Sequence, residues 1–208
     1  MEAVLATRIQ TLGLAPYEDV AARMRAFTEQ RLADTPDELW MVEHPPVYTL
    51  GQGADEQFGP KLANGIPVIR SERGGEITYH GPGQAVVYTL VDLQRRSIKV
   101  KEFVRLLEQG VIDLLGAFGV VADRRPGAPG VYVGEAKIAA LGIRVTRGRA
   151  WHGVALNVDM DLSPFLAIDP CGYPGLPVTQ TKDLGIAGTA QALGLRLAQR
   201  LEQRLDHA

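Results

Sequence analysis

The chain has 208 residues, of which 46% are hydrophobic and 22% charged, and its formal net charge is −2. These values are average for a globular protein and argue against disorder, a membrane protein and a general nucleic-acid binder. No stretch reaches the roughly 18 apolar residues of a membrane-spanning helix, and the first residues lack a signal-peptide pattern. We therefore expect one cytoplasmic domain over residues 1–208.

In the first half of the chain, apolar spacing predicts a helix over 17–32, followed by a strand at ELWMVEH (38–44). The prolines of HPPVYTLG (44–51) predict extended chain. AVVYTLVDL (85–93) is apolar on both faces, which is typical of a buried central strand.

The second half begins with a predicted helix from Ser97, its cap, to about Phe118, and RRPGAPG (124–130) is predicted as a loop. VYV, AKIAALGIRV and WHGVALNV then follow with short turn signals between them, which predicts an antiparallel meander.

SPFLAI (163–168) is predicted as one helical turn capped by Ser163, and the last 25 or so residues as a helix. Helices and strands mix without a strict βαβ alternation. We therefore expect an α+β fold with mixed or antiparallel sheets flanked by helices.

The only cysteine, Cys171, lies in DPCGYPG at residues 169–175. One cysteine cannot form an internal disulfide or a multi-cysteine zinc site, so we expect no structural metal. A free cysteine is often a small buried hydrophobe. Here prolines and glycines surround the thiol and indicate a loop, where functional groups are often presented, so a nucleophile is the alternative.

A cysteine nucleophile needs a neighbour that stabilises its thiolate, because a free thiol is mostly protonated at pH 7. Among the histidines, His207 is near the chain end and His44 precedes two prolines, which leaves His80 and His152.

Lys137 is a further candidate for that role. It either extends to water from the start of its strand or points inward, since period-two alternation puts it on one face with other inward residues. Those residues are Ala139, Leu141, Ile143 and Val145.

RGGEITYHGPGQ (73–84) contains four glycines, which let a backbone approach a ligand closely. It is not a nucleotide-phosphate loop, because the P-loop and dinucleotide patterns are absent. A hairpin turn before a buried strand is one interpretation, and His80 alone would be a structural histidine. The other interpretation is a binding site, in which small residues at 140–142 and 153–155 leave room for a narrow apolar tunnel.

In combination, these stretches resemble the lipoyl(octanoyl) transferases of protein lipoylation. The resemblance covers most of the chain, in the family's order and spacing: HPPVYTLG, RGGEITYHGPGQAVVYTLVDL, GEAKIAALGIRV, WHGVALNV and DPCGYPG. It implies an α+β fold related to the catalytic domain of biotin and lipoate ligases.

The resemblance also implies an activity. An octanoyl or lipoyl group would pass from acyl carrier protein, through a thioester on Cys171, to a lysine of a lipoyl domain, without ATP or metal. The acceptors would be the lipoyl domains of 2-oxoacid dehydrogenases and the glycine cleavage H protein. Lys137 would tune the pKa of the thiol and shuttle protons. The implied acyl pocket comprises Arg73, Gly74, Gly75, Glu76, Ile77, Thr78, Tyr79, His80, Ala140, Leu141, Gly142, Gly153, Val154 and Ala155.

Two other functions remain open from the sequence. An ATP-dependent lipoate ligase of the same fold would rely on a lysine without an acyl-cysteine, and a non-catalytic carrier-docking protein would leave Cys171 inert. Two basic clusters are candidates for docking an acidic carrier, and the second is favoured because its hairpin leads into the Lys137 strand. The first is Arg95, Arg96, Lys99 and Lys101, and the second is Arg144, Arg147 and Arg149.

Overall fold

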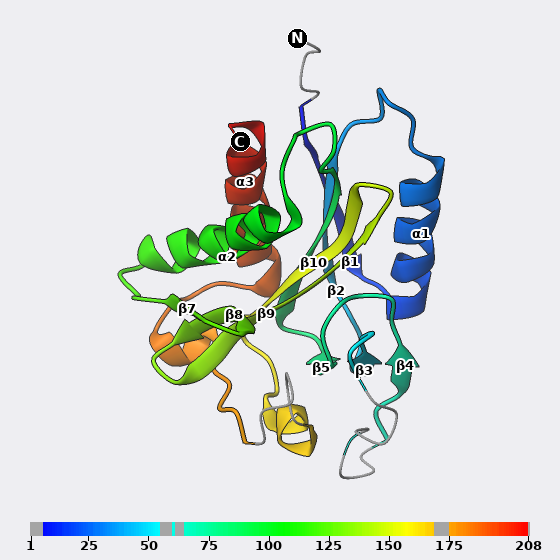
Figure 1. The fold of residues 1–208 in the computed structure, drawn as a ribbon. Coiled ribbons are helices and arrows are strands. Elements are labelled where there is room, and N and C mark those ends of the chain that lie inside the picture. Colours follow the sequence, from blue (N-terminus) through cyan, green and yellow to red (C-terminus); the bar gives the residue numbers. More distant parts are fainter. Residues whose placement is uncertain (1–5, 55–59, 61–64, 169–174, 208) are drawn as a thin grey trace.

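The computed structural model describes residues 6–54, 60, 65–168 and 175–207. Within them the chain forms helices on both sides of a large sheet, with a smaller sheet at one end (Figure 1). The α-helices are α1 (Tyr17–Gln30), α2 (Val100–Gly116) and α3 (Ala190–Asp206), and short 3-10 helices cover Ser163–Ala167 and Thr181–Leu184.

Mixed strand directions characterise the large sheet, whose order is β1-β2-β6-β10-β9-β8-β7. Strands β1 and β2 are parallel, and every other neighbouring pair is antiparallel. Its strands are β1 (Arg8–Leu14), β2 (Glu38–Glu43), β6 (Gln84–Asp92), β7 (Asp123–Arg125), β8 (Ala128–Val133), β9 (Ala136–Thr146) and β10 (Arg149–Asn157). The small sheet has the order β4-β3-β5, with β3 (Val47–Leu50), β4 (Val68–Arg70) and β5 (Ile77–His80).

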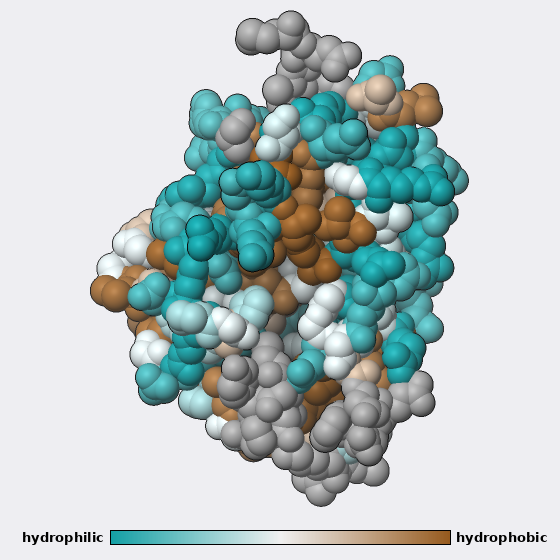
Figure 2. Space-filling view, viewed as in Figure 1, coloured by the Kyte–Doolittle hydropathy of each residue, from teal (hydrophilic) through white to brown (hydrophobic). Residues whose placement is uncertain are grey.

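Each face of the large sheet has its own apolar core. Helices α2 and α3 pack on one face, where Phe103, Leu107 and Leu197 are fully buried. Helix α1 packs on the other face, against Trp40 and Trp151 among others. The exterior seen in Figure 2 is mostly hydrophilic, with an apolar strip across the middle of this view.

The α+β prediction is confirmed, and so is the antiparallel meander, which is β8-β9-β10. The predicted central strand is β6, which has large-sheet strands paired on both of its edges. This strand is apolar on both faces because helices cover both faces of the sheet.

Two predicted helix caps are wrong, and one predicted loop is corrected. Ser97 does not cap α2: the chain turns there with a φ of 55°, and the helix begins after Lys99, whose N–H donates to Glu102. The helical turn predicted at 163–168 is confirmed as a 3-10 helix, but Ser163 is its first residue and not its cap, and the Ser163 N–H donates to the Asp161 carboxylate. The predicted loop at 124–130 contains the turn of the β7-β8 hairpin, because Gly127 supplies the positive φ that the turn needs.

Candidate active site

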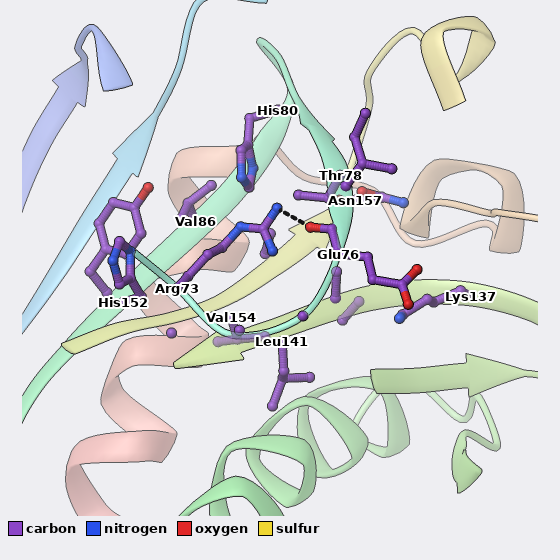
Figure 3. A pocket seen from close by; sticks show the side chains of 18 of the residues that line it. Arg73, Glu76, Thr78, His80, Val86, Lys137, Leu141, His152, Val154 and Asn157 are labelled. Atoms are coloured by element: carbon purple, nitrogen blue, oxygen red, sulfur yellow. Dashed lines mark hydrogen bonds between the residues drawn. The ribbon is translucent and has the colours of Figure 1, made fainter. Parts of the chain in front are cut away.

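A pocket lies between the large sheet and the segment that leads into β5 (Figure 3). Its empty volume is about 740 Å³ with open solvent at the mouth included. Strands β6, β9 and β10 form one wall, and Arg73 to Thr78 form much of the other. The predicted pocket residues are all brought to it except Gly74, which bonds to the β9 backbone, and Tyr79, which packs on Tyr48 and Phe165.

Arg73 holds the glycine-rich segment in shape. Its buried guanidinium donates to the Thr49 hydroxyl and to the carbonyl oxygens of Thr49, Gly74 and Glu76. A side chain at Gly142 would come within 2.9 Å of the Gly74 carbonyl, so this glycine lets the segment lie directly on β9. Of the small residues predicted on adjacent strands, Gly142 therefore makes room for this segment over the sheet.

Lys137 points inward and only 4% of its surface is exposed, which agrees with one of the two predicted alternatives. Its side chain does not, however, lie on the face of β9 that period-two alternation predicted. The β8-β9 register shifts between Val131 and Tyr132, which leaves one extra residue in β9 near Ile138. Both Ile138 and Ala139 consequently face the α2-α3 core, and Lys137 changes face and lines the pocket. A bulge of this kind re-aims a side chain, which the simple period-two rule cannot predict.

The Lys137 side chain lies across Gly130, where an added Cβ would be 2.4 Å from Cε. Its Nζ donates to the Pro129 carbonyl at 2.9 Å and lies 5.6 Å from the centre of the Tyr132 ring. The amine is therefore held by β8 at one end of the pocket, beside Glu76 in Figure 3.

Cys171 lies outside the described residues. The chain that follows it is paired with the Lys137 backbone: the Lys137 N–H donates to Pro177, and the Thr179 N–H donates to the Lys137 carbonyl. Pro177 is six residues after Cys171 in the sequence.

A hydrogen-bond chain connects β5 to this same segment. The His80 ring bonds to Gln84, whose amide donates to Asn157, and the Asn157 amide donates to the Thr179 carbonyl. Thr179 is bonded to Lys137, so the chain fixes the wall around the lysine.

The three buried histidines here are neutral at pH 7. Burial lowers the pKa of His80 to about 3, that of His152 to about 3 and that of His44 to about 4. Neither His80 nor His152 is then a cation that could stabilise a thiolate, and Lys137 and Arg73 are the basic side chains among the described lining residues.

Sequence reasoning missed several residues of the site. His44, set aside because it precedes prolines, is fully buried, and its ring nitrogens bond to the Ala15 carbonyl and the Tyr88 hydroxyl. The available signal was the presence of polar residues in otherwise apolar strands. The lining residues that were not predicted are Tyr17, Val86, Tyr88, Ala139, His152, Asn157, Phe165 and Val178.

Across the described ranges, the helices are all too short or too polar to cross a membrane. The same residues contain no group of three or more side chains of the types that hold a metal ion.

The fold is that of lipoate and biotin ligases. A bi-partite lipoate protein ligase from Thermoplasma acidophilum has a TM-score of 0.74 and 18% identity, over 97% of this chain and 84% of that one. Biotin protein ligase from Aquifex aeolicus gives 0.62 and 11%, over 95% and 70%. Residues 16–197 match the model of the lipoyl protein ligase A/B catalytic domain, and the chain belongs to this family.

Within the family, the chain is similar to proteins named octanoyltransferase. The one from Dechloromonas aromatica is 57% identical over 198 residues, which are 95% of this chain and 96% of that protein. The one from Pseudomonas entomophila is 52% identical over 200 residues, which are 96% and 93% of the two chains.

Proposed function

We propose that this protein is an octanoyltransferase that moves an octanoyl group from acyl carrier protein to a lysine of a lipoyl domain. The similarity to octanoyltransferases over almost the whole chain carries the proposal. An apolar pocket with a buried lysine at one end supports it, because this arrangement suits an acyl chain whose reacting carbonyl lies near the amine.

The proposed reaction has two steps. The Cys171 thiolate attacks the carrier thioester, a carbon–sulfur bond forms to Cys171, and the bond to the carrier sulfur breaks. Lys137 gives its proton to the departing carrier thiolate. The acceptor lysine amine then attacks the acyl-cysteine, an amide forms, the carbon–sulfur bond to Cys171 breaks, and Lys137 takes the proton that the amine loses.

ATP has no role in this scheme, because a thioester already carries an activated acyl group and the final amide is more stable. The test combines the purified protein, octanoyl acyl carrier protein and a lipoyl domain, with and without ATP. We expect octanoylation of the lipoyl domain at equal rates in both. A strict need for ATP would favour the lipoate ligase alternative, and absence of transfer would favour a docking protein.

Neither basic cluster predicted from the sequence lies beside Lys137. Arg95 and Arg96 bond to the buried Asp37 and belong to the packing of the domain. Arg147 is in the β9-β10 turn, about 30 Å along the strand from Lys137, which argues against the cluster favoured from the sequence. Arg125 is much closer, since it lies 4.4 Å from the Tyr132 ring that Lys137 also contacts.

We expect the carrier to dock near Arg125, because the acyl thioester must reach the Lys137 end. Arg125→Glu should lower kcat/KM for octanoyl acyl carrier protein several-fold at low salt, with a smaller difference at high salt. Arg147→Glu, the matched control, should leave kcat/KM unchanged. The opposite pattern would move the docking surface to the β9-β10 turn.

A further inference from the structure

His152 has a backbone conformation that its strand does not require. Its φ is +64°, in the left-handed region that costs a non-glycine residue roughly 1–3 kcal/mol. Strict alternation along β10 would put its side chain with Ala150 and Val154, which face the α2-α3 core. The ring instead stacks on Trp151 at 4.5 Å and meets Tyr88 edge-on at 6.0 Å, both of which face α1.

The imidazole lines the pocket without a polar partner. Only 1% of the residue is exposed, and neither ring nitrogen has a hydrogen bond to any described residue. By contrast, both ring nitrogens of the equally buried His44 are bonded. Buried polar groups are nearly always paired, so an unpaired ring held by a strained backbone indicates a functional role.

His152 also lies at the opposite end of the pocket from Lys137 (Figure 3). It pairs with Ile143, which is six residues along β9 from Lys137, and the two backbones are therefore about 20 Å apart. Val86 and the small residues Ala140 and Ala155 of the lining lie between the two ends.

We propose that His152 sets the acyl-chain length that the pocket accepts. A short chain ends before the ring. A longer chain meets the imidazole itself, which is packed between Trp151 and Tyr88 and held by a strained backbone, so the ring cannot easily move aside. Its two buried nitrogens gain no hydrogen bond from a hydrocarbon chain, and the ring is therefore a steric stop. This inference refines the proposed function and rests on the acyl pocket assigned there.

Binding of free octanoic and dodecanoic acids, measured by calorimetry, tests the inference without requiring acyl transfer. His152→Gly removes the ring and tolerates the positive φ, so it should improve the affinity for dodecanoic relative to octanoic acid by about ten-fold or more. His152→Asn shortens the side chain at a position where asparagine also tolerates this backbone, and it should shift the ratio in the same direction by less.

Phe103→Leu is the control, because it replaces a fully buried ring outside the pocket lining by a smaller side chain and should leave the ratio of the two affinities unchanged. Thermal unfolding identifies any variant that fails to fold, and the folded one of the two His152 variants then decides. The inference is overturned if the dodecanoic-to-octanoic affinity ratio of the folded variant stays within two-fold of the ratio of the unmodified protein. It is also overturned if the unmodified protein binds neither acid. Normal binding without transfer would instead contradict the proposed function alone.

Discussion

Lys137→Met is expected to reduce octanoyl transfer by about 10²–10⁴-fold, the range that a positioned proton donor and acceptor typically contributes. Methionine keeps the volume of the buried stem, so the fold should persist. Cys171 should also react with iodoacetamide only at higher pH, because a nearby positive charge favours the thiolate.

The control for this substitution is Lys101→Met, which removes an exposed lysine of α2. It should change neither the transfer rate nor the alkylation profile. If folded Lys137→Met retains transfer within three-fold of the unmodified protein, the lysine is a structural residue and its role in proton transfer is refuted.

Asp37→Asn is expected to lower the free energy of unfolding by about 3–5 kcal/mol, the usual cost of removing one partner from a buried ion pair. The Asp37 side chain is completely buried, and its oxygens accept from Arg31 at 2.5 Å, Arg95 at 2.7 Å and Arg96 at 2.6 Å. Asparagine has a similar shape but removes the negative partner of Arg31 and Arg95, while Arg96 keeps Asp206. Urea unfolding at pH 7 measures the difference.

The effect of Asp37 depends on pH in a defined direction. Burial alone would raise its pKa, but hydrogen bonds from Arg96, the Asp92 N–H and Arg31 outweigh burial and lower the pKa below 3.8. A lowered carboxyl pKa stabilises the folded state fully above about pH 4, and that stabilisation is lost as the pH falls through the lowered value. The difference between Asp37→Asn and the unmodified protein should therefore shrink only below about pH 4.

Asp113→Asn is the control for Asp37→Asn. Its carboxylate pairs with Arg204 at a partly exposed site, where such pairs contribute about 0–1 kcal/mol. If both variants lose the same free energy of unfolding, burial does not determine how much the Asp37 cluster contributes to stability.

Elements with local signals were predictable from the sequence. The meander follows from turn residues between apolar runs, and the glycine-rich wall of the pocket follows from RGGEITYHGPGQ. The three-residue strands β4 and β7 were missed, because so few residues carry no clear period and pairing with neighbours determines their conformation. The seven-residue β1 was missed because it is an edge strand whose residues are exposed or half-buried, without a buried face.

The details of the site were less predictable because they depend on departures from regular geometry. The bulge beside Ile138 gives Lys137 its direction, and the positive φ at His152 turns a second ring toward the α1 face. Neither the bulge nor the positive φ leaves a recognisable pattern in the local sequence. The partners of Arg95 and Arg96 were equally hidden, since Asp37 is distant in sequence.

The central claim is that Cys171 carries the acyl group, and mass measurement of the intact protein tests it most directly. The protein is incubated with octanoyl acyl carrier protein in the absence of ATP and of any acceptor, and modified peptides are then located. We predict one octanoyl group in a thioester at Cys171, its loss when a lipoyl domain is added, and no adduct in Cys171→Ser. An unmodified protein that still octanoylates the lipoyl domain, or full activity of Cys171→Ser, would contradict the account.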